Sequence, residues 1–454
     1  MSMMTTVLTT LAVSLVFAGP PRPQDFQDRP VSRIAFGSCA NHESPQPIWE
    51  AVNRWHPDVF VFLGDNVYGD TEDMVVLADK YAMLGAKPGY EELKANSAIA
   101  ATWDDHDYGA NDAGLEYSKK EASKDVFMTF FEEPEDSSRR THPGIYHSYL
   151  LGPPGQRVQL ILLDVRTFRT PLQKREITPA MEEGFIGPYD TRDDAESTML
   201  GEAQWKWLEQ QLQEPADLRV FGMSTQFLPV FNGWEAWANM PHERQRLIDL
   251  IRRTRAEGVV FISGDTHWAE VSRAEEPGLY PLYDLTSSGL TEVWTGVAPN
   301  RNRIGRPYLG ANFGTIEIDW EAKPGPVVIL GISDVHGREV IRRRVPLSDL
   351  DFALEPDTAR PPTAEWSSSR GAMLLSIEGD RVTGTFGGPA GTITGVLKGD
   401  TITGTWSSRQ ANGPFKLTFS RTGSWLHGRY GMTDQDGPDP MPWSWTAHLR
   451  SGRD

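Results

Sequence analysis

Short apolar runs recur from about Val31 to Val345, and most of them end at or next to a polar residue. Several runs are continuous in Val, Ile, Leu and Phe, which is typical of strands buried on both faces of a sheet. Amphipathic segments such as Gln204–Leu212 and Glu243–Thr254 lie between them and predict helices. Strands that alternate with helices predict an α/β core. The six apolar runs are Ser32–Cys39, Val59–Asp65, Ile99–Asp104, Val158–Asp164, Leu218–Thr225 and Gly258–Asp265.

Three further alternating runs predict an antiparallel meander that closes the core. They are Phe313–Asp319, Val327–Asp334 and Glu339–Val345. A Pro-containing stretch follows and predicts a linker between domains. The predicted organisation is a core over 31–350, a linker over 351–365 and a C-terminal module over 366–454.

The C-terminal module carries a repeat. GDRVTGTF at Gly379–Phe386 recurs as GDTITGTW at Gly399–Trp406, and Gly423–Tyr430 is a looser copy. Each copy combines a turn glycine, alternating polar and apolar residues, and an aromatic residue. This pattern predicts an all-β up-and-down meander or barrel of six to eight strands. The module contains few candidate catalytic residues, so its expected role is accessory binding, such as contact with an extracellular glycan or surface, or packing against the main domain.

The N-terminus predicts export. The first 18 residues carry no charge, and the apolar run Val7–Ala18 is too short to span a bilayer. Val16 and Ala18 fit the small-residue pattern of a cleavage site, which predicts a signal peptide of residues 1–18 removed near Ala18. The mature chain would then be secreted or reside in the periplasm or cell envelope. A frayed apolar N-terminus is the alternative, and no later run is long enough for a membrane helix.

The net charge of the chain is −18, which argues against nucleic acid and anionic membranes as partners. The same charge repels phosphate at long range. A site for phosphate esters would therefore need local positive charge, which metal ions supply. The single cysteine, Cys39, excludes an intrachain disulfide and leaves its thiol free for other chemistry.

Polar residues at the ends of the apolar runs are the candidate site. Open α/β sheets bind ligands at the carboxyl ends of their strands, so these residues are expected to converge. Each aspartate alone is more often a turn residue or a helix cap. That explanation is weak for the whole set, which is Cys39, Asp65, Asp104, Asp105 and Asp265.

Two of these positions lie in motifs with metal-binding character. Asp65 is placed to bridge two cations, and Tyr68 could reach one of them, where a phenolate ligand requires an acidic metal such as Fe³⁺. The acidic stretch 104–112 offers carboxylate and amide oxygens suited to Ca²⁺, Mg²⁺ or Mn²⁺. A solvated acidic loop is the alternative for that stretch. His106 within it is a candidate general acid.

The remaining candidates complete a two-metal centre. Asp265 and His267 can both reach one site from a strand end, and the Cys39 thiolate is a candidate ligand, with a buried structural thiol as the alternative. Arg166 could bind a phosphate oxygen or form a salt bridge with Asp164. Two cations held together clamp a phosphate and activate water, so no serine or cysteine nucleophile is needed.

These motifs, in this order, resemble the PhoD-like (alkaline phosphatase D) family of metallophosphatases over roughly Arg33 to Leu290. They read FGSC, FLGDNVYGD, ATWDDHDYGAND, LLDVRTFR and ISGDTHW. The resemblance implies a four-layer core of two sheets flanked by helices, and an Fe³⁺ accompanied by one or two Ca²⁺ ions, with other divalent metals as substitutes. It implies Cys39, Asp65 and Tyr68 as iron ligands, and Asp104 or Asp105 with Asn111 and Asp265 as calcium ligands. His106 would be the proton donor, and His267 matches the last histidine of the superfamily's Gly-His-x-His motif.

The sequence thus predicts an exported metal-dependent phosphoesterase that hydrolyses phosphomonoesters, phosphodiesters or both, with catalytic roles for His106, Arg166 and His267. The alternative is a non-catalytic exported calcium-binding or carbohydrate-binding protein that retains a relic phosphatase core. Every candidate ligand position of the motifs is filled, which favours the enzyme.

Overall fold

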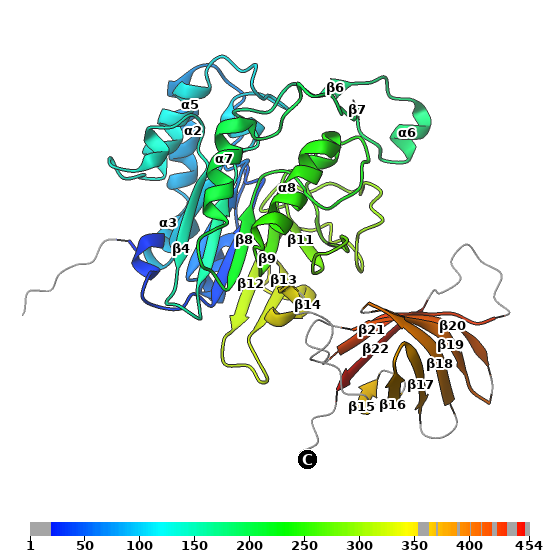
Figure 1. Ribbon diagram of the computed structural model, residues 1–454. Coiled ribbons are helices and arrows are strands. Elements are labelled where there is room, and N and C mark those ends of the chain that lie inside the picture. The colour runs from blue at the N-terminus through cyan, green and yellow to red at the C-terminus, as the bar shows by residue number, and fades with distance from the viewer. Residues whose placement is uncertain are drawn as a thin grey trace, which may run out of the picture.

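The protein is described here by a computed structural model that covers residues 20–449, apart from 353–362, 369–370, 388–390, 400, 410, 420–424 and 434–442. The predicted signal peptide and most of the predicted linker lie outside the described residues. Two six-stranded sheets form the main body, and helices flank them (Figure 1). This four-layer α/β arrangement confirms the predicted fold class.

The first sheet has the strand order β14-β13-β12-β1-β2-β3. Its parallel half is β1 (Arg33–Gly37), β2 (Val59–Leu63) and β3 (Ala98–Thr102). Its antiparallel half is the predicted meander of β12 (Asn312–Asp319), β13 (Val327–Asp334) and β14 (Glu339–Pro346). Every residue of β2 and of β13 is buried, and the continuous apolar sequence of β2 is typical of such a strand.

The second sheet has the strand order β10-β11-β9-β8-β5-β4. Its four inner strands are parallel: β5 (Val158–Leu162), β8 (Leu218–Gly222), β9 (Val259–Ser263) and β11 (Leu282–Ser287). The edge strands β4 (His147–Leu151) and β10 (Ala269–Ala274) are antiparallel to their neighbours. The apolar pattern does not single out β4, β10 or β11, because polar residues interrupt all three.

Helices cover the outer faces of the sheets. One buried cluster joins the first sheet to α1 (Ile48–Trp55), α2 (Met74–Gly85), α3 (Pro88–Asn96) and α5 (Lys120–Phe130). The predicted helices α7 (Gly201–Gln211) and α8 (Pro241–Thr254) place Trp205, Leu208, Leu247 and Ile251 in the core of the second sheet. Shorter elements are α4 (Asp105–Tyr108), α6 (Pro179–Glu183), and the small pair β6 (Gln173–Lys174) and β7 (Tyr189–Asp190). No described helix is long and apolar enough to cross a bilayer.

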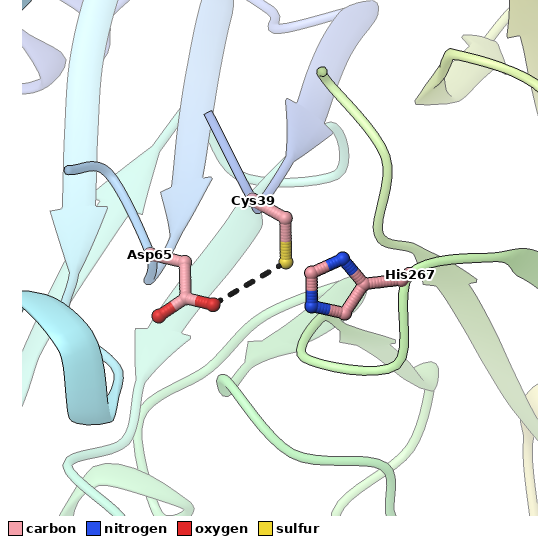
Figure 2. A group of neighbouring side chains, drawn as sticks. All are labelled: Cys39, Asp65 and His267. Carbon is pink, nitrogen blue, oxygen red and sulfur yellow. Dashed lines mark hydrogen bonds between the residues drawn. The ribbon is translucent and has the colours of Figure 1, made fainter. Parts of the chain in front are cut away.

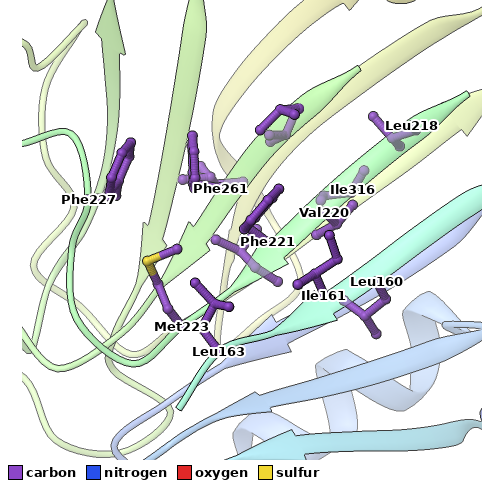
Figure 3. Packing of buried hydrophobic residues seen from close by; sticks show 14 of the residues in the cluster. Leu160, Ile161, Leu163, Leu218, Val220, Phe221, Met223, Phe227, Phe261 and Ile316 are labelled. Atoms are coloured by element: carbon purple, nitrogen blue, oxygen red, sulfur yellow. The ribbon is translucent and has the colours of Figure 1, made fainter. Parts of the chain in front are cut away.

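The main core lies between the sheets (Figure 3). It combines Leu160, Val220 and Ile262 of the second sheet with Ile316 of the first, all fully buried. Burying a side chain of this size contributes about 1.5–3 kcal/mol. The two sheets are thereby held together, and one isolated bridge between Ser38 and Ser288 joins them beside the ends of β1 and β11.

The C-terminal strands form a closed barrel, as the repeat predicts. In both clear repeats the first glycine, Gly379 or Gly399, has a positive φ and makes a turn. A Cβ atom on the central glycine, Gly384 or Gly404, would lie within 2.2 Å of a backbone oxygen of the neighbouring strand. The repeat therefore encodes tight turns and close strand contacts. The barrel strands are β15 (Thr363–Ser368), β16 (Gly371–Glu378), β17 (Arg381–Phe386), β18 (Gly391–Lys398), β19 (Thr401–Ser407), β20 (Asn412–Phe419), β21 (Trp425–Tyr430) and β22 (Trp443–Leu449).

Candidate metal centre

The ends of four parallel strands from both sheets converge on one place. Cys39 follows β1, Asp65 follows β2, Asp104 and Asp105 follow β3, and Asp265 follows β9. Four residues here have a positive φ. The values are 62° at Cys39, 49° at Asp65, 69° at Asp265 and 61° at the nearby His267. Non-glycine residues in this region of backbone space are uncommon and cluster at functional sites. The predicted convergence of strand ends is therefore present in the fold.

One group of donor atoms joins the two sheets. Ligand atoms of Cys39, Asp65 and His267 all lie within 4.8 Å of one another. Figure 2 shows the three side chains turned toward a common centre, with the Cys39 thiol 3.5 Å from Oδ2 of Asp65. The Tyr68 ring lies beside this group, with its centroid 4.5 Å from that of His106. A thiol, a carboxylate, an imidazole and a phenol are thus available to one ion.

A second group contains only carboxylates. Oxygens of Asp104, Asp105 and Asp265 lie within 4.8 Å of one another, and Asp105 also groups with Asp65 and His106. Asp104 and Asp105 are both buried and both turned to the centre, so the choice between them stays open. Asp105 links the carboxylate group to the cysteine-containing group through Asp65.

The electrostatics of the centre fit a bound cation. Burial, followed by the charges of Asp105 and Asp104, raises the pKa of Asp65 well above its usual range. Burial also raises the pKa of the Cys39 thiol and of Asp265. A positive ion among these groups reverses such shifts. Five of the candidate ligands each have a buried donor atom without a hydrogen-bond partner among the described residues: Oδ1 of Asp65, Oη of Tyr68, Oδ2 of Asp104, Oδ1 of Asp105 and Nδ1 of His267.

Asp107 connects the ends of β2 and β3 through hydrogen bonds. Its carboxylate accepts backbone N–H bonds from Asp104 at 2.7 Å and from Asp65 at 3.2 Å, and it accepts the Tyr81 hydroxyl at 3.0 Å. The Asn66 amide also donates to it at 2.5 Å. Asp107 therefore positions the candidate ligands and has little capacity left for an ion. The sequence placed it in the acidic stretch without revealing this role.

Gly64 allows the same two strand ends to approach. Its φ is +96°, and an added Cβ atom would lie 2.4 Å from Cβ of Asp104. We expect Gly64→Ala to lower the free energy of unfolding by about 2–4 kcal/mol, because backbone strain and overpacking add. Thermal unfolding should be compared with Gly155→Ala, at which φ is +86° but no atom lies within 4 Å of the new Cβ. Equal losses in the two variants would show that the close approach is unimportant.

His106 is held by a residue outside the predicted set. Its Nδ1 lies 2.8 Å and 2.9 Å from the two carboxylate oxygens of Asp70. Burial lowers the pKa of His106, but the hydrogen bond to Asp70 and the charge of Asp105 outweigh burial and raise the pKa to about 9. In the metal-free protein this raised pKa favours the protonated imidazole at neutral pH. A protonated, oriented histidine at the edge of the centre is suited to donate a proton.

Arg166 is completely buried, and its guanidinium contacts carboxylates of the protein. Nε donates to Oδ1 of Asp104 at 2.6 Å, and Nη1 donates to Oε2 of Glu235 at 2.8 Å. The alternative of a salt bridge between Arg166 and Asp164 is wrong. Asp164 accepts a hydrogen bond from the backbone N–H of Arg166 and not from its guanidinium. The observed contacts favour a role in supporting Asp104, and direct contact with phosphate stays a prediction.

Asn111 lies at the rim of the centre. It is exposed, and its amide donates to Asp112 at 2.8 Å, so its predicted role as a ligand stays a prediction. Asp112 and Glu235 form a further carboxylate group with Asp105. Glu235 is also paired with Arg169 at 3.1 Å. Sequence reasoning missed Glu235 because it lies 69 residues from Arg166, in a loop without a motif.

The two flanked sheets with acidic strand ends define a metallophosphoesterase-like core. The sequence model of PhoD-like phosphatases matches residues 34–303, and the chain belongs to this family. It is 23% identical over 317 residues to alkaline phosphatase D of Bacillus subtilis (strain 168), covering 60% of this chain. The chain spans about half of that relative, 52% of its length.

One solved structure supports the fold. The structure titled "Structure of PhoD" superposes with a TM-score of 0.52 at 14% identity, covering 92% of this chain and 74% of that one. A weaker likeness, with a TM-score of 0.45 and 11% identity, is to "GAP50 the anchor in the inner membrane complex of Plasmodium", covering 70% of this chain and 89% of that one. The resemblance predicted from the motifs is confirmed at the level of the family and the fold.

Proposed function

We propose that this protein hydrolyses phosphate esters, monoesters or diesters, at the centre between the ends of β1, β2, β3 and β9. The observation that carries the proposal is the set of buried donor atoms without hydrogen-bond partners, which come from both sheets and meet there. Leaving such atoms unpaired in an interior is costly unless an ion compensates. Membership of the PhoD-like phosphatase family supports the reaction class.

The two groups of donors would hold different ions. Cys39, Asp65, Tyr68 and His267 combine a thiol and a phenol with harder ligands, which suits a trivalent iron. Asp104, Asp105 and Asp265, with Asn111 at the rim, offer only oxygen ligands, which suit Ca²⁺. Bound cations supply charge neutralisation for the phosphate and lower the pKa of a water molecule so that it can attack.

The protein's own residues carry out the remaining steps. His106 delivers its proton to the departing ester oxygen, and Asp70 keeps the ring oriented for that transfer. Arg166 holds Asp104 in place through the bond to Oδ1, which leaves Oδ2 of Asp104 facing the centre. Asp107 fixes the spacing between the Asp65 and Asp104 loops.

We further propose that the chain is exported, on the evidence of the uncharged apolar run before Ala18. The C-terminal barrel contributes no residue to the described donor groups. Its proposed role is contact with an extracellular glycan or surface.

The proposed activity is tested by elemental analysis of the purified protein, combined with assays of nitrophenyl phosphate and bis(nitrophenyl) phosphate. We expect iron and calcium to co-purify, and removal of the metals by a chelator to reduce hydrolysis by at least about a thousandfold. Restoring the metals should restore hydrolysis. Full metal content with no hydrolysis of either ester would contradict the proposal and favour a relic phosphatase core.

A further inference from the structure

We propose that the site prefers phosphate esters whose alcohol part carries an aromatic ring, and that a wall of four aromatic side chains binds this ring through its three partly exposed members. The aromatic wall consists of Phe185, Trp234, Trp268 and Trp294. This inference rests on the proposed phosphoesterase function and names the substrate class for the same site.

The aromatic wall begins in contact with the proposed metal centre. The ring of His267 stacks on Trp294 at a centroid distance of 4.8 Å and an angle of 9°. Trp294 contacts Trp234 at 5.2 Å, and Phe185 lies 5.6 Å from Trp294 and 5.4 Å from Trp234. Trp268 is fully buried behind them, 6.1 Å from Phe185. The wall is thus one continuous aromatic surface that extends from a candidate ligand.

A second connection joins the wall to the acidic side of the centre. Trp234 directly precedes Glu235, which pairs with Arg166. The segment that carries Phe185 ends at Tyr189, and the Tyr189 hydroxyl donates to the carboxylate of Asp112. The Trp234 indole N–H donates to the Phe185 carbonyl at 3.0 Å. These contacts fix the wall relative to the groups that would bind phosphate.

The wall keeps partly exposed ring surface. Phe185, Trp234 and Trp294 are all partly exposed, although rings of this size gain stability from full burial. Aromatic side chains beside converging polar groups are the usual lining of a small-molecule site. A flat aromatic ring of the substrate can stack on these side chains, whereas a short alkyl chain covers much less of their exposed surface.

The negative charge of the protein limits how many phosphate groups a substrate can carry. The net charge is −18, and the centre itself is lined by carboxylates. Additional phosphate groups beyond the one that is cleaved would be repelled. The inferred substrates therefore carry one phosphate group joined to an alcohol or phenol with an aromatic ring.

Two esters with alcohols of similar acidity test the preference: 2-phenylethyl phosphate and propyl phosphate. For the metal-loaded protein we expect kcat/KM to be about tenfold higher for the phenylethyl ester, within the range that stacking on aromatic side chains contributes. In Trp234→Leu the ratio of the two kcat/KM values should fall to within about twofold of one. Phe185→Leu should lower the ratio in the same direction and serves if Trp234→Leu does not fold.

Trp207→Leu is the matched control. Trp207 is also partly exposed, but it contacts Tyr146 at 4.7 Å outside the wall, so the ratio should stay at its wild-type value. Equal kcat/KM values for the two esters in the wild-type protein would overturn the inference while leaving the phosphoesterase function intact. An unchanged ratio in well-folded wall variants would also overturn it. If the wild-type protein hydrolysed neither ester but cleaved nitrophenyl phosphate or bis(nitrophenyl) phosphate, this inference alone would fall. If it cleaved none of the four esters, the proposed function would fall as well.

Discussion

Asp65→Asn is expected to abolish turnover while making the metal-free protein more stable. Asp65 lies where the two donor groups meet, and an amide can no longer bridge two cations with two charged oxygens. We expect kcat/KM for nitrophenyl phosphate to fall by at least about a thousandfold. Elemental analysis should show loss of the ion held by Cys39, Tyr68 and His267.

In the metal-free protein, Asp65→Asn is expected to raise the free energy of unfolding. Because the pKa of Asp65 is raised in the folded state, its ionised form opposes folding at every pH above the pKa of an unfolded aspartate. The neutral amide removes this repulsion with Asp105 and Asp104. We therefore expect the melting temperature after chelation to rise by about 1–2 °C, as a gain near 1 kcal/mol gives in a domain of roughly 300 residues. The metal-loaded protein should melt lower than wild type, because binding energy is lost.

Asp79→Asn is the control for this substitution, since Asp79 is an exposed aspartate on α2 away from the centre. Its activity, metal content and melting temperature should match those of the wild type. Retained turnover in Asp65→Asn would remove the centre from the reaction. A lower melting temperature of the chelated variant would show that Asp65 is compensated in some other way.

The sequence alone predicts the strands and the residues at their ends well, for a physical reason. β2 and β9 are fully buried, so their apolar runs stand out, and the aspartates that follow them must lie at the same edge of the layers. Tyr68 and His267 were found because they lie three and two residues beyond those aspartates. Strands with mixed sequences such as β4 and β10 carry no comparable signal.

Contacts between distant loops could not be predicted in this way. Asp70, Asp107 and Glu235 are carboxylates like many others in a chain of net charge −18. What sets them apart is a partner: His106 for Asp70, two backbone N–H groups for Asp107, and two buried arginines for Glu235. The Asp164 salt bridge, one of two alternatives considered for Arg166, is absent for the same reason, because nearness in sequence does not show which carboxylate the side chain reaches.

Arg166→Met is expected to give the largest loss of stability. The substitution keeps much of the side-chain volume but leaves Asp104 buried without its cation and leaves Glu235 with Arg169 alone. Removing one partner of a buried ion pair typically costs about 3–5 kcal/mol, and we expect a loss of that size in the free energy of unfolding. The loss should be smaller at pH 5 than at pH 8, because the stranded carboxylates can then take up protons. Denaturant unfolding at the two pH values measures both effects.

Arg253→Met is the control for Arg166→Met, because it removes the same charge from an exposed ion pair instead of a buried one. Arg253 pairs with Glu209 at 3.0 Å, but 58% of the arginine side chain and 46% of the glutamate side chain are exposed, so its loss should cost less than about 1 kcal/mol.

If Arg166 acts by holding Asp104, its replacement lowers stability and kcat/KM together, because a proposed ligand is no longer fixed. If Arg166→Met left stability unchanged and only raised KM for the ester, the guanidinium would be binding phosphate directly. The burial of Arg166 and its short bonds to Asp104 and Glu235 favour the first result.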